Sequence, residues 1–231
     1  MKKLVAVLIL LTLSVAVAGS ALAYVRKEIN IYPAPAGLKI DGKLDEWHTS
    51  AIVSQDPKKG RESAVLYFMY DKDNLYIAGE IKDATPLLND KVKVAEVYQG
   101  DAIEIFISAD PKADPERESY APTDRQFALV MGKQPHSWMW ATNGDLPGTE
   151  IAAVVTDFGE NNPGYIFEAK VPLKSIHPDL KLAPGMKIGF DCAVDFSTED
   201  GTNREIQHSW NAGSNSGIWA VPKLWGYANI K

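Results

Sequence analysis

Short segments rich in β-branched and aromatic residues recur along most of the chain, and turn-forming residues separate them at intervals of roughly ten to twenty residues. None of the chain has the pattern of a long amphipathic helix. This pattern predicts an all-β fold, an antiparallel β-sandwich with jelly-roll or immunoglobulin-like layers. The predicted strands are residues 63–70, 74–81, 101–108, 125–131, 150–157, 165–172, 187–196 and 225–230.

The segment "DAIEIFIS" has two different faces. Ile103, Ile105 and Ile107 recur at period two, which predicts that they point into the core. The opposite face carries Glu104, and Tyr98 precedes this glutamate by six residues. A carboxylate and an aromatic ring on one surface are compatible with solvent, with core or with a binding site. Glu104 is therefore the first candidate functional residue.

The N-terminus has the pattern of an export signal. Two lysines after Met1 are followed by a long apolar stretch and by the A-x-A motif of residues 21–23. We therefore expect a signal peptide over residues 1–23 and a single exported domain over residues 24–231, secreted or held in the periplasm or cell envelope. An uncleaved membrane anchor is the alternative, since the apolar run is near the length that spans a bilayer.

Composition excludes several classes of partner. The formal charge falls from −6 to −8 when Lys2 and Lys3 leave with the signal peptide, and no cluster of Lys and Arg remains to follow a phosphate backbone. We expect no nucleic-acid partner and no membrane contact beyond the signal segment.

Cys192 is the only cysteine, so it cannot form an internal disulfide, and we expect it to be a small core side chain.

The sequence lacks the common catalytic motifs. It contains no G-x-S-x-G, H-E-x-x-H, P-loop or C-x-x-C pattern, and its four histidines are scattered without paired spacing. Glu104 and Glu168 are the pair of carboxylates that a glycosidase would need, if neighbouring strands brought them together. We expect a non-catalytic protein.

Binding has more support, because four tryptophans lie in polar stretches rich in Gly, Asn and Ser. They are Trp138 and Trp140 in "HSWMWATNGD", and Trp210 and Trp219 in "HSWNAGSNSGIWAVP". Such rings close the edges of a sandwich core, or they stack on the C–H face of a sugar while neighbouring polar groups bind its hydroxyls.

Two turns are rich in carboxylates, the hard oxygen ligands that Ca²⁺ prefers. "IDGKLDEW" contributes Asp41 and Asp45, and "DFSTEDGTNRE" contributes Asp195 and Asp200. These four residues are candidate ligands for a structural calcium ion. Plain solvated acidic turns are the equal alternative.

Six strings occur in the order found in a known family: "IDGKLDEW", "LYFMYDKDNLYIAGEIKD", "GDAIEIFIS", "GYIFEAKVPLKSI", "GMKIGFDCAVDF" and a terminal W-x-x-P-x-x-W-G-Y. Over residues 38–230 the chain resembles family 9 carbohydrate-binding modules and their relatives with a DOMON-like β-sandwich. The resemblance implies an oligo- or polysaccharide ligand, structural calcium, and a binding role that assists a separate glycoside hydrolase or a surface assembly.

The resemblance also implies a set of site residues. Family members hold a terminal sugar between two tryptophans, beside a glutamate, an arginine and amide groups. Tyr98 stands where the family has the first tryptophan, and this smaller ring is a departure from the family pattern. Glu104 matches the glutamate. The other implied residues are Arg125, Gln126 and Trp219, with Trp210 as the fallback for the second ring.

Two other functions remain open. Related sandwiches bind haem as small subunits of periplasmic oxidoreductases, and Met131, Met139 and His136 are candidate axial ligands here. The colour of the purified protein would distinguish that function. The other alternative is a surface or assembly module without a small ligand, whose exposed aromatic side chains would form a protein interface.

Overall fold

The computed structural model describes residues 25–231, apart from residues 48–50, 56–62, 91 and 160. For residues 51–55 and 63 it describes the backbone alone. The predicted signal peptide, residues 1–23, lies outside the described residues. In the part of the chain that the structure describes, no helix has both the length and the apolar character needed to cross a membrane.

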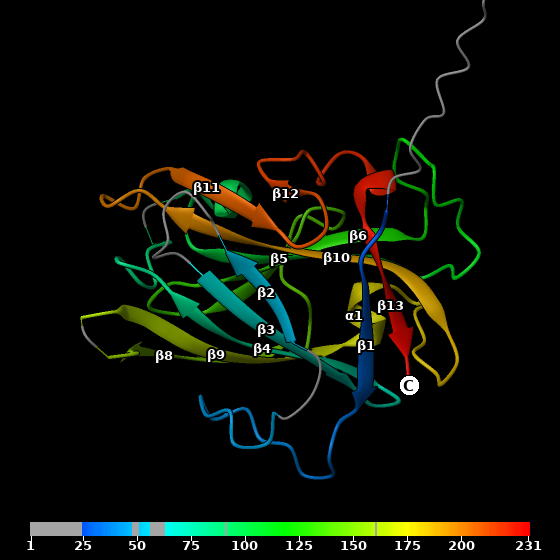
Figure 1. Ribbon diagram of the computed structural model, residues 1–231, viewed down its shortest axis with the longest axis horizontal. Helices are drawn as coiled ribbons and strands as arrows, with labels where there is room; N and C mark the ends of the chain where they lie inside the picture. Colours follow the sequence, from blue (N-terminus) through cyan, green and yellow to red (C-terminus); the bar gives the residue numbers. More distant parts are fainter. Residues whose placement is uncertain (1–24, 48–50, 56–62, 91, 160) are drawn as a thin grey trace, which may run out of the picture.

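Two β-sheets pack face to face and form a sandwich (Figure 1). The first sheet has β10 near its centre, flanked by β5 on one side and by β13 and β11 on the other. Its strands are β7 (His136–Met139), β6 (Asp124–Val130), β5 (Ala102–Ser108), β10 (Lys187–Ser197), β13 (Gly226–Ile230), β11 (Arg204–Ser209) and β12 (Gly213–Ser214).

The second sheet runs from β3 through β4 and β9 to β8 at its edge, and β2 pairs with β3. Its strands are β2 (Ala51–Gln55), β3 (Ser63–Tyr70), β4 (Asn74–Lys82), β8 (Glu150–Asp157) and β9 (Pro163–Pro172). Three short helical turns complete the described secondary structure: η1 (Val94–Gln99), α1 (Leu173–Ile176) and η2 (Pro222–Leu224). The predicted all-β sandwich is therefore confirmed.

Strand β1 (Glu28–Pro33) joins the two sheets. Its first part pairs in parallel with β13, and its last two residues pair in parallel with β3. The other named strand pairs are antiparallel, so β1 is where the structure departs from the purely antiparallel prediction. Because one strand serves both sheets, the sandwich is closed along that side.

The hydrophobic core lies between the sheets. Ile103, Ile105 and Ile107 of β5 are buried there, as their period-two spacing predicts. The core bridges both layers through an edge-to-face contact of Phe68 on β3 with Phe190 on β10, whose ring centres are 5.1 Å apart. Since the inner face of β5 is fixed in this way, Glu104 must lie on the outer face of the first sheet.

Candidate functional site

A pocket of about 440 Å³ lies on the outer face of the first sheet. Two small apolar clusters flank it: one formed by Val97, Ala102, Ala128, Val130 and Trp138, the other by Phe106, Ala193, Ile218 and Trp225. Between them, the polar side chains of Glu104 on β5 and Gln126 on β6 line the pocket.

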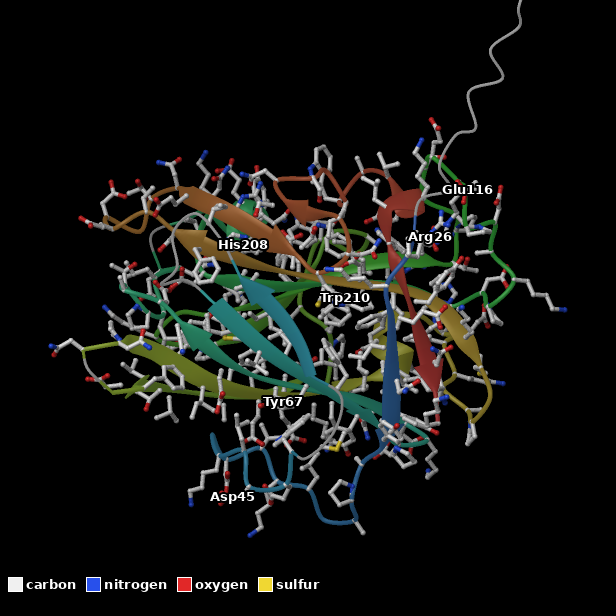
Figure 2. All side chains as sticks on the ribbon, in the orientation of Figure 1. Arg26, Asp45, Tyr67, Glu116, His208 and Trp210 are labelled. Atoms are coloured by element: carbon white, nitrogen blue, oxygen red, sulfur yellow. The ribbon has the colours of Figure 1, made fainter. Side chains whose placement is uncertain are left out.

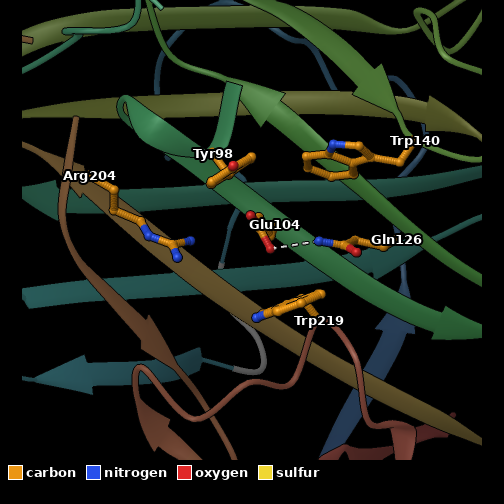
Figure 3. Close-up of a pocket in the computed structure, with 6 residues that line it drawn as sticks. All are labelled: Tyr98, Glu104, Gln126, Trp140, Arg204 and Trp219. Carbon is orange, nitrogen blue, oxygen red and sulfur yellow. Dashed lines mark hydrogen bonds between the residues drawn. The ribbon is translucent and has the colours of Figure 1, made fainter. Parts of the chain in front are cut away.

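Glu104 and Gln126 form the polar floor of the pocket. Each alternates with core residues on its own strand, so both point outward, and the Nε2 of Gln126 donates to the Oε2 of Glu104 at 3.0 Å (Figure 3). The hydroxyl of Tyr120 donates to the amide oxygen of Gln126 at 3.5 Å, which holds the other end of this amide. These hydrogen bonds therefore hold the side chains of Glu104 and Gln126 in place without a ligand.

Aromatic rings form opposite walls of the pocket. Figure 3 shows Tyr98 and Trp140 on one side of Glu104 and Trp219 on the other. Trp219 is 57% exposed, which is unusual for so large an apolar side chain. Its neighbour Ile218 is fully buried, and the carbonyl of Ile218 accepts a hydrogen bond of 3.0 Å from the indole of Trp225. This anchor turns the loop so that Trp219 faces outward.

Buried neighbouring residues also hold the wall formed by Tyr98 and Trp140. Val97 packs against the outer face of the sheet and so fixes η1, which presents Tyr98 to the pocket. Trp138 is buried on the same face, and Trp140 lies two residues further along the chain. The indole of Trp140 donates to the carbonyl of Ala95 at 3.4 Å, which joins this ring to η1.

Arg204, the first residue of β11, supplies the positive charge of the pocket. Its guanidinium carbon lies 5.3 Å from the centre of the Tyr98 ring. Its Nη1 donates to the Oδ1 of Asp195 at 3.0 Å. The arginine is therefore held between an aromatic face and a buried carboxyl group, and Figure 3 shows it directed toward Glu104.

The carboxyl group of Glu104 is almost completely removed from water. Burial raises its pKa, while a hydrogen bond with Asp195, the charge of Arg204 and the bond from Gln126 act in the opposite direction. The Nε2 of Gln207 also donates to Glu104, at 3.3 Å. Glu104 is thus bound tightly within the protein and presents only part of its surface to the pocket.

The structure brings together four of the six predicted binding residues: Tyr98, Glu104, Gln126 and Trp219. Arg125 lies elsewhere, because it shares the face of Phe127 on β6, and its guanidinium donates to the carbonyls of Pro122 and Asp124. Trp210 packs into the hydrophobic core and lies inside the molecule (Figure 2).

Two pocket residues, Trp140 and Arg204, were not in the predicted site. Trp140 lies in one of the polar, tryptophan-containing stretches, so its neighbourhood gave a signal. Arg204 gave none, because β11 was not among the predicted strands and no spacing placed its first residue beside Tyr98. The possible catalytic partner of Glu104 is absent from the site: Glu168 belongs to β9 in the other sheet.

The four predicted calcium ligands do not converge. Asp45 lies at the opposite end of the molecule from β10 and β11 (Figures 1 and 2). Asp195 is occupied by Arg204, and Asp200 accepts bonds within its own turn. In the described ranges, no group of three or more His, Cys, Asp and Glu side chains is arranged to hold a metal ion.

The turn that contains Asp41 has a structural role. The Oε2 of Glu168 accepts hydrogen bonds from the backbone N–H groups of Asp41, Gly42 and Lys43, at 2.6 to 3.1 Å. The indole of Trp47 donates to the other oxygen of Glu168 at 2.7 Å. The "IDGKLDEW" string therefore encodes a loop fastened to the outer side of the second sheet.

A different group of buried oxygen atoms would suit a hard cation better. It surrounds Asp101, whose carboxylate accepts from the backbone of Leu88 and Ser197, and whose carbonyl accepts from Asn89. Within the described residues, the carboxyl group of Asp101 is in hydrogen-bonding contact with Asp83 and Ser197, and the Oδ1 of Asn89 is buried without a hydrogen-bond partner. Carboxylate, amide and hydroxyl oxygens are ligands that calcium accepts.

The candidate haem ligands do not face the pocket. Met131 and Met139 are buried in the main hydrophobic core, and His136 is exposed at the start of β7. The geometry instead favours a flat ligand with apolar faces and a polar edge, because aromatic walls enclose carboxylate, amide and guanidinium groups. A sugar ring has this character.

Comparison with known proteins decides the family. The family model described as "Carbohydrate family 9 binding domain-like" matches residues 40–231. The chain belongs to this family. The family resemblance predicted from the six sequence strings is thus confirmed.

Individual relatives agree with this family 9 assignment. Exoglucanase XynX of Acetivibrio thermocellus is 28% identical over 180 residues, which cover 76% of this chain but only 14% of that enzyme. Among solved structures, a family 9 module of Caldicellulosiruptor kristjanssonii in complex with cellotriose has a TM-score of 0.66 at 21% identity, covering 89% of this chain and 94% of that one. The same organism's module with glucose has a TM-score of 0.62 at 22% identity, covering 87% and 95%. At this identity the likeness of the structures shows the shared fold.

Proposed function

We propose that the protein is a carbohydrate-binding module that holds a saccharide between Tyr98 and Trp140 on one side and Trp219 on the other. The observation that carries this proposal is the placement of two aromatic walls around a polar floor in a chain of family 9. The exposure of Trp219 supports it, because a ring that is not needed for the core is available for a ligand.

The polar contacts of the bound sugar would come from Glu104, Gln126 and Arg204. Glu104 accepts hydrogen bonds from hydroxyl groups, Gln126 offers both a donor and an acceptor, and Arg204 donates. Since these groups are already held by Tyr120, Gln207 and Asp195, little conformational entropy is lost when a ligand binds.

Cello-oligosaccharides are the ligands to test first. Structural relatives were solved with cellotriose and with glucose, and a sequence relative is an exoglucanase. We propose that this chain takes the same class of sugar and, as an exported module, serves a separate glycoside hydrolase or a surface assembly.

Binding without cleavage is part of the proposal. A glycosidase places two carboxyl groups on either side of the scissile bond. Among the described residues that line the pocket, Glu104 alone has a carboxylate. Incubation of the protein with cellotriose should therefore release neither glucose nor cellobiose. Release of either sugar by the purified protein would contradict a purely binding role.

Calcium is the proposed structural ion. The buried oxygens around Asp83 and Asp101 are the group in the described structure that best suits it, because two carboxyl groups, an amide oxygen and a hydroxyl lie together there. Their position beside η1, through Asn89 and the carbonyl of Val97, would let the ion stabilise the wall that includes Tyr98.

Titration calorimetry with cellotriose and glucose tests the proposed function. We expect the wild-type protein to bind and Trp219→Ala to lose most of its affinity. Tyr32→Ala is the matched control, because Tyr32 is also an exposed ring but belongs to β1 and does not line the pocket. Equal affinity of wild type and Trp219→Ala would refute the pocket, and no binding of any glycan by the wild type would refute the function.

A further inference from the structure

Asp195 lies beneath the pocket and contacts two of its polar groups without lining it. Its neighbours Val194 and Phe196 point into the hydrophobic core, so Asp195 faces the same side of the sheet as Glu104. The side chain of Asp195 is completely buried. It therefore can act on a ligand only through the residues above it.

The two oxygens of Asp195 have different surroundings. The Oδ1 accepts the hydrogen bond of 3.0 Å from Arg204. The Oδ2 is buried, and among the described residues no N–H group or hydroxyl donates to it. The carboxyl group of Glu104 is in hydrogen-bonding contact with Asp195. Two carboxyl groups make such a contact only when a hydrogen lies between them.

The charge balance of Arg204, Glu104 and Asp195 also favours a hydrogen between the two carboxyl groups. Arg204 brings one positive charge to two buried carboxyl groups, and among the described residues of this network a second buried negative charge would have no partner of opposite sign. Burial and the charge of Glu104 raise the pKa of Asp195 well above its usual value, although Arg204 acts against this. The amides of Gln126 and Gln207 both donate to Glu104 and so favour its ionised form. Asp195 is thus the member of the pair that keeps the hydrogen.

We infer that Asp195 is a positioning residue that joins Arg204 to Glu104, accepting from the guanidinium with one oxygen and donating its own hydrogen to Glu104 with the other. This inference rests on the proposed function, because the two groups that it positions are proposed ligand contacts. Without this bridge, Arg204 would lose the bond that holds it over Tyr98, and Glu104 would lose a hydrogen-bond donor.

Two substitutions separate a hydrogen-bonded bridge from an ion pair. Asp195→Asn keeps an oxygen for Arg204 and supplies an N–H group to Glu104, whereas Asp195→Ala supplies neither. With cellotriose, we expect Asp195→Ala to weaken binding by about tenfold, and Asp195→Asn to restore it to within about threefold of wild type. Asp191→Asn is the matched control, since Asp191 is a buried aspartate on the same face of β10 but outside the network.

Wild-type affinity in Asp195→Ala would overturn the inference. An Asp195→Asn variant that binds as weakly as Asp195→Ala would also overturn it, because that result would mean that Asp195 acts as an ionised group, which an amide cannot replace. Two measurements do not depend on the ligand. The infrared difference spectrum between wild type and Asp195→Asn should show the band of a neutral buried carboxyl group that wild type has and the variant lacks. The guanidinium N–H of Arg204 that binds Asp195 should exchange slowly with solvent in wild type and in Asp195→Asn, and rapidly in Asp195→Ala.

These ligand-free results separate the two claims. If wild-type protein binds no sugar while both spectroscopic results hold, the proposed function fails and the bridge stands. If sugar binds normally but the neutral carboxyl band is unchanged by Asp195→Asn, the bridge is wrong and the binding function stands.

Discussion

The guanidinium of Arg204 lies over the ring of Tyr98, with 5.3 Å between the guanidinium carbon and the ring centre. A cation over an aromatic face is attracted to the ring, and the attraction increases when both groups are partly removed from water. Tyr98 is smaller than the tryptophan expected from the family resemblance. Its ring is held in place by its contact with Arg204, in addition to the packing of Val97, which fixes η1.

Removal of Arg204 should therefore weaken ligand binding through two effects, the lost contact to the sugar and the less well-held tyrosine. We expect Arg204→Ala to weaken cellotriose binding by about tenfold or more. Arg125→Ala is the matched control, because its guanidinium binds backbone carbonyls at the end of β6 and is outside the pocket. A larger loss in Arg125→Ala than in Arg204→Ala would show that the sequence-based assignment of the arginine was correct.

Tyr98 should act through its face rather than its hydroxyl. Tyr98→Phe should bind cellotriose within about twofold of wild type, whereas Tyr98→Ala should lose about threefold to tenfold, in line with the energies of aromatic contacts. Calorimetry on both variants measures the difference. An equal loss in the two variants would instead identify the hydroxyl group as the contact.

Calcium should stabilise the folded state if it binds among the buried oxygens around Asp83 and Asp101. A metal that binds only the native protein raises the midpoint of thermal unfolding, and a chelator reverses the shift. We expect Asp83→Asn to abolish most of this shift. Asp41→Asn should retain it, because Asp41 is exposed and lies in the loop fastened by Glu168. An unfolding midpoint that the chelator leaves unchanged would rule out a structural calcium.

The buried carboxyl group of Asp191 should make stability depend on pH. Burial raises its pKa to about 7, although the N–H groups of Cys192, Asn211 and Gly226 partly oppose the shift. The folded state therefore binds this proton more tightly than the unfolded state, in which the carboxyl group has an ordinary pKa of about 4. The contribution to stability is fully present below the unfolded pKa and is lost as the pH rises toward about 7.

Urea unfolding at about pH 5 and about pH 8 tests this dependence, compared between wild type and Asp191→Asn. The asparagine cannot ionise, so the free energy of unfolding should fall less with pH in the variant than in wild type. The other buried carboxyl groups are the same in both proteins and cancel in the comparison. Identical slopes in the two proteins would contradict the raised pKa of Asp191.

The sequence predicted the fold well wherever strands are long and alternate regularly. The predicted segments 63–70 and 150–157 coincide with β3 and β8, and 187–196 is one residue shorter than β10. Strands β7 and β12 were missed because they are short and have too few residues for a period-two pattern. Strand β1 was missed for another reason: its segment runs into the proline-rich stretch at residues 33–35.

Strand alternation and family spacing suffice to place Glu104, Gln126 and Trp219 in one pocket, although their role in binding stays a prediction. Alternation also explains why Arg125 lies outside, since a residue next to Gln126 on a strand must point to the other face. Arg204 depended on the pairing of β11 with β10 and on an irregularity beside Ser197, which sequence spacing does not reveal.

A crystal structure of the protein with cellotriose tests the central claim most directly. It should show a sugar ring between Trp219 and the wall formed by Tyr98 and Trp140, with its hydroxyl groups hydrogen-bonded to Glu104, Gln126 or Arg204. A sugar bound at another surface, with this pocket filled only by water, would contradict the account.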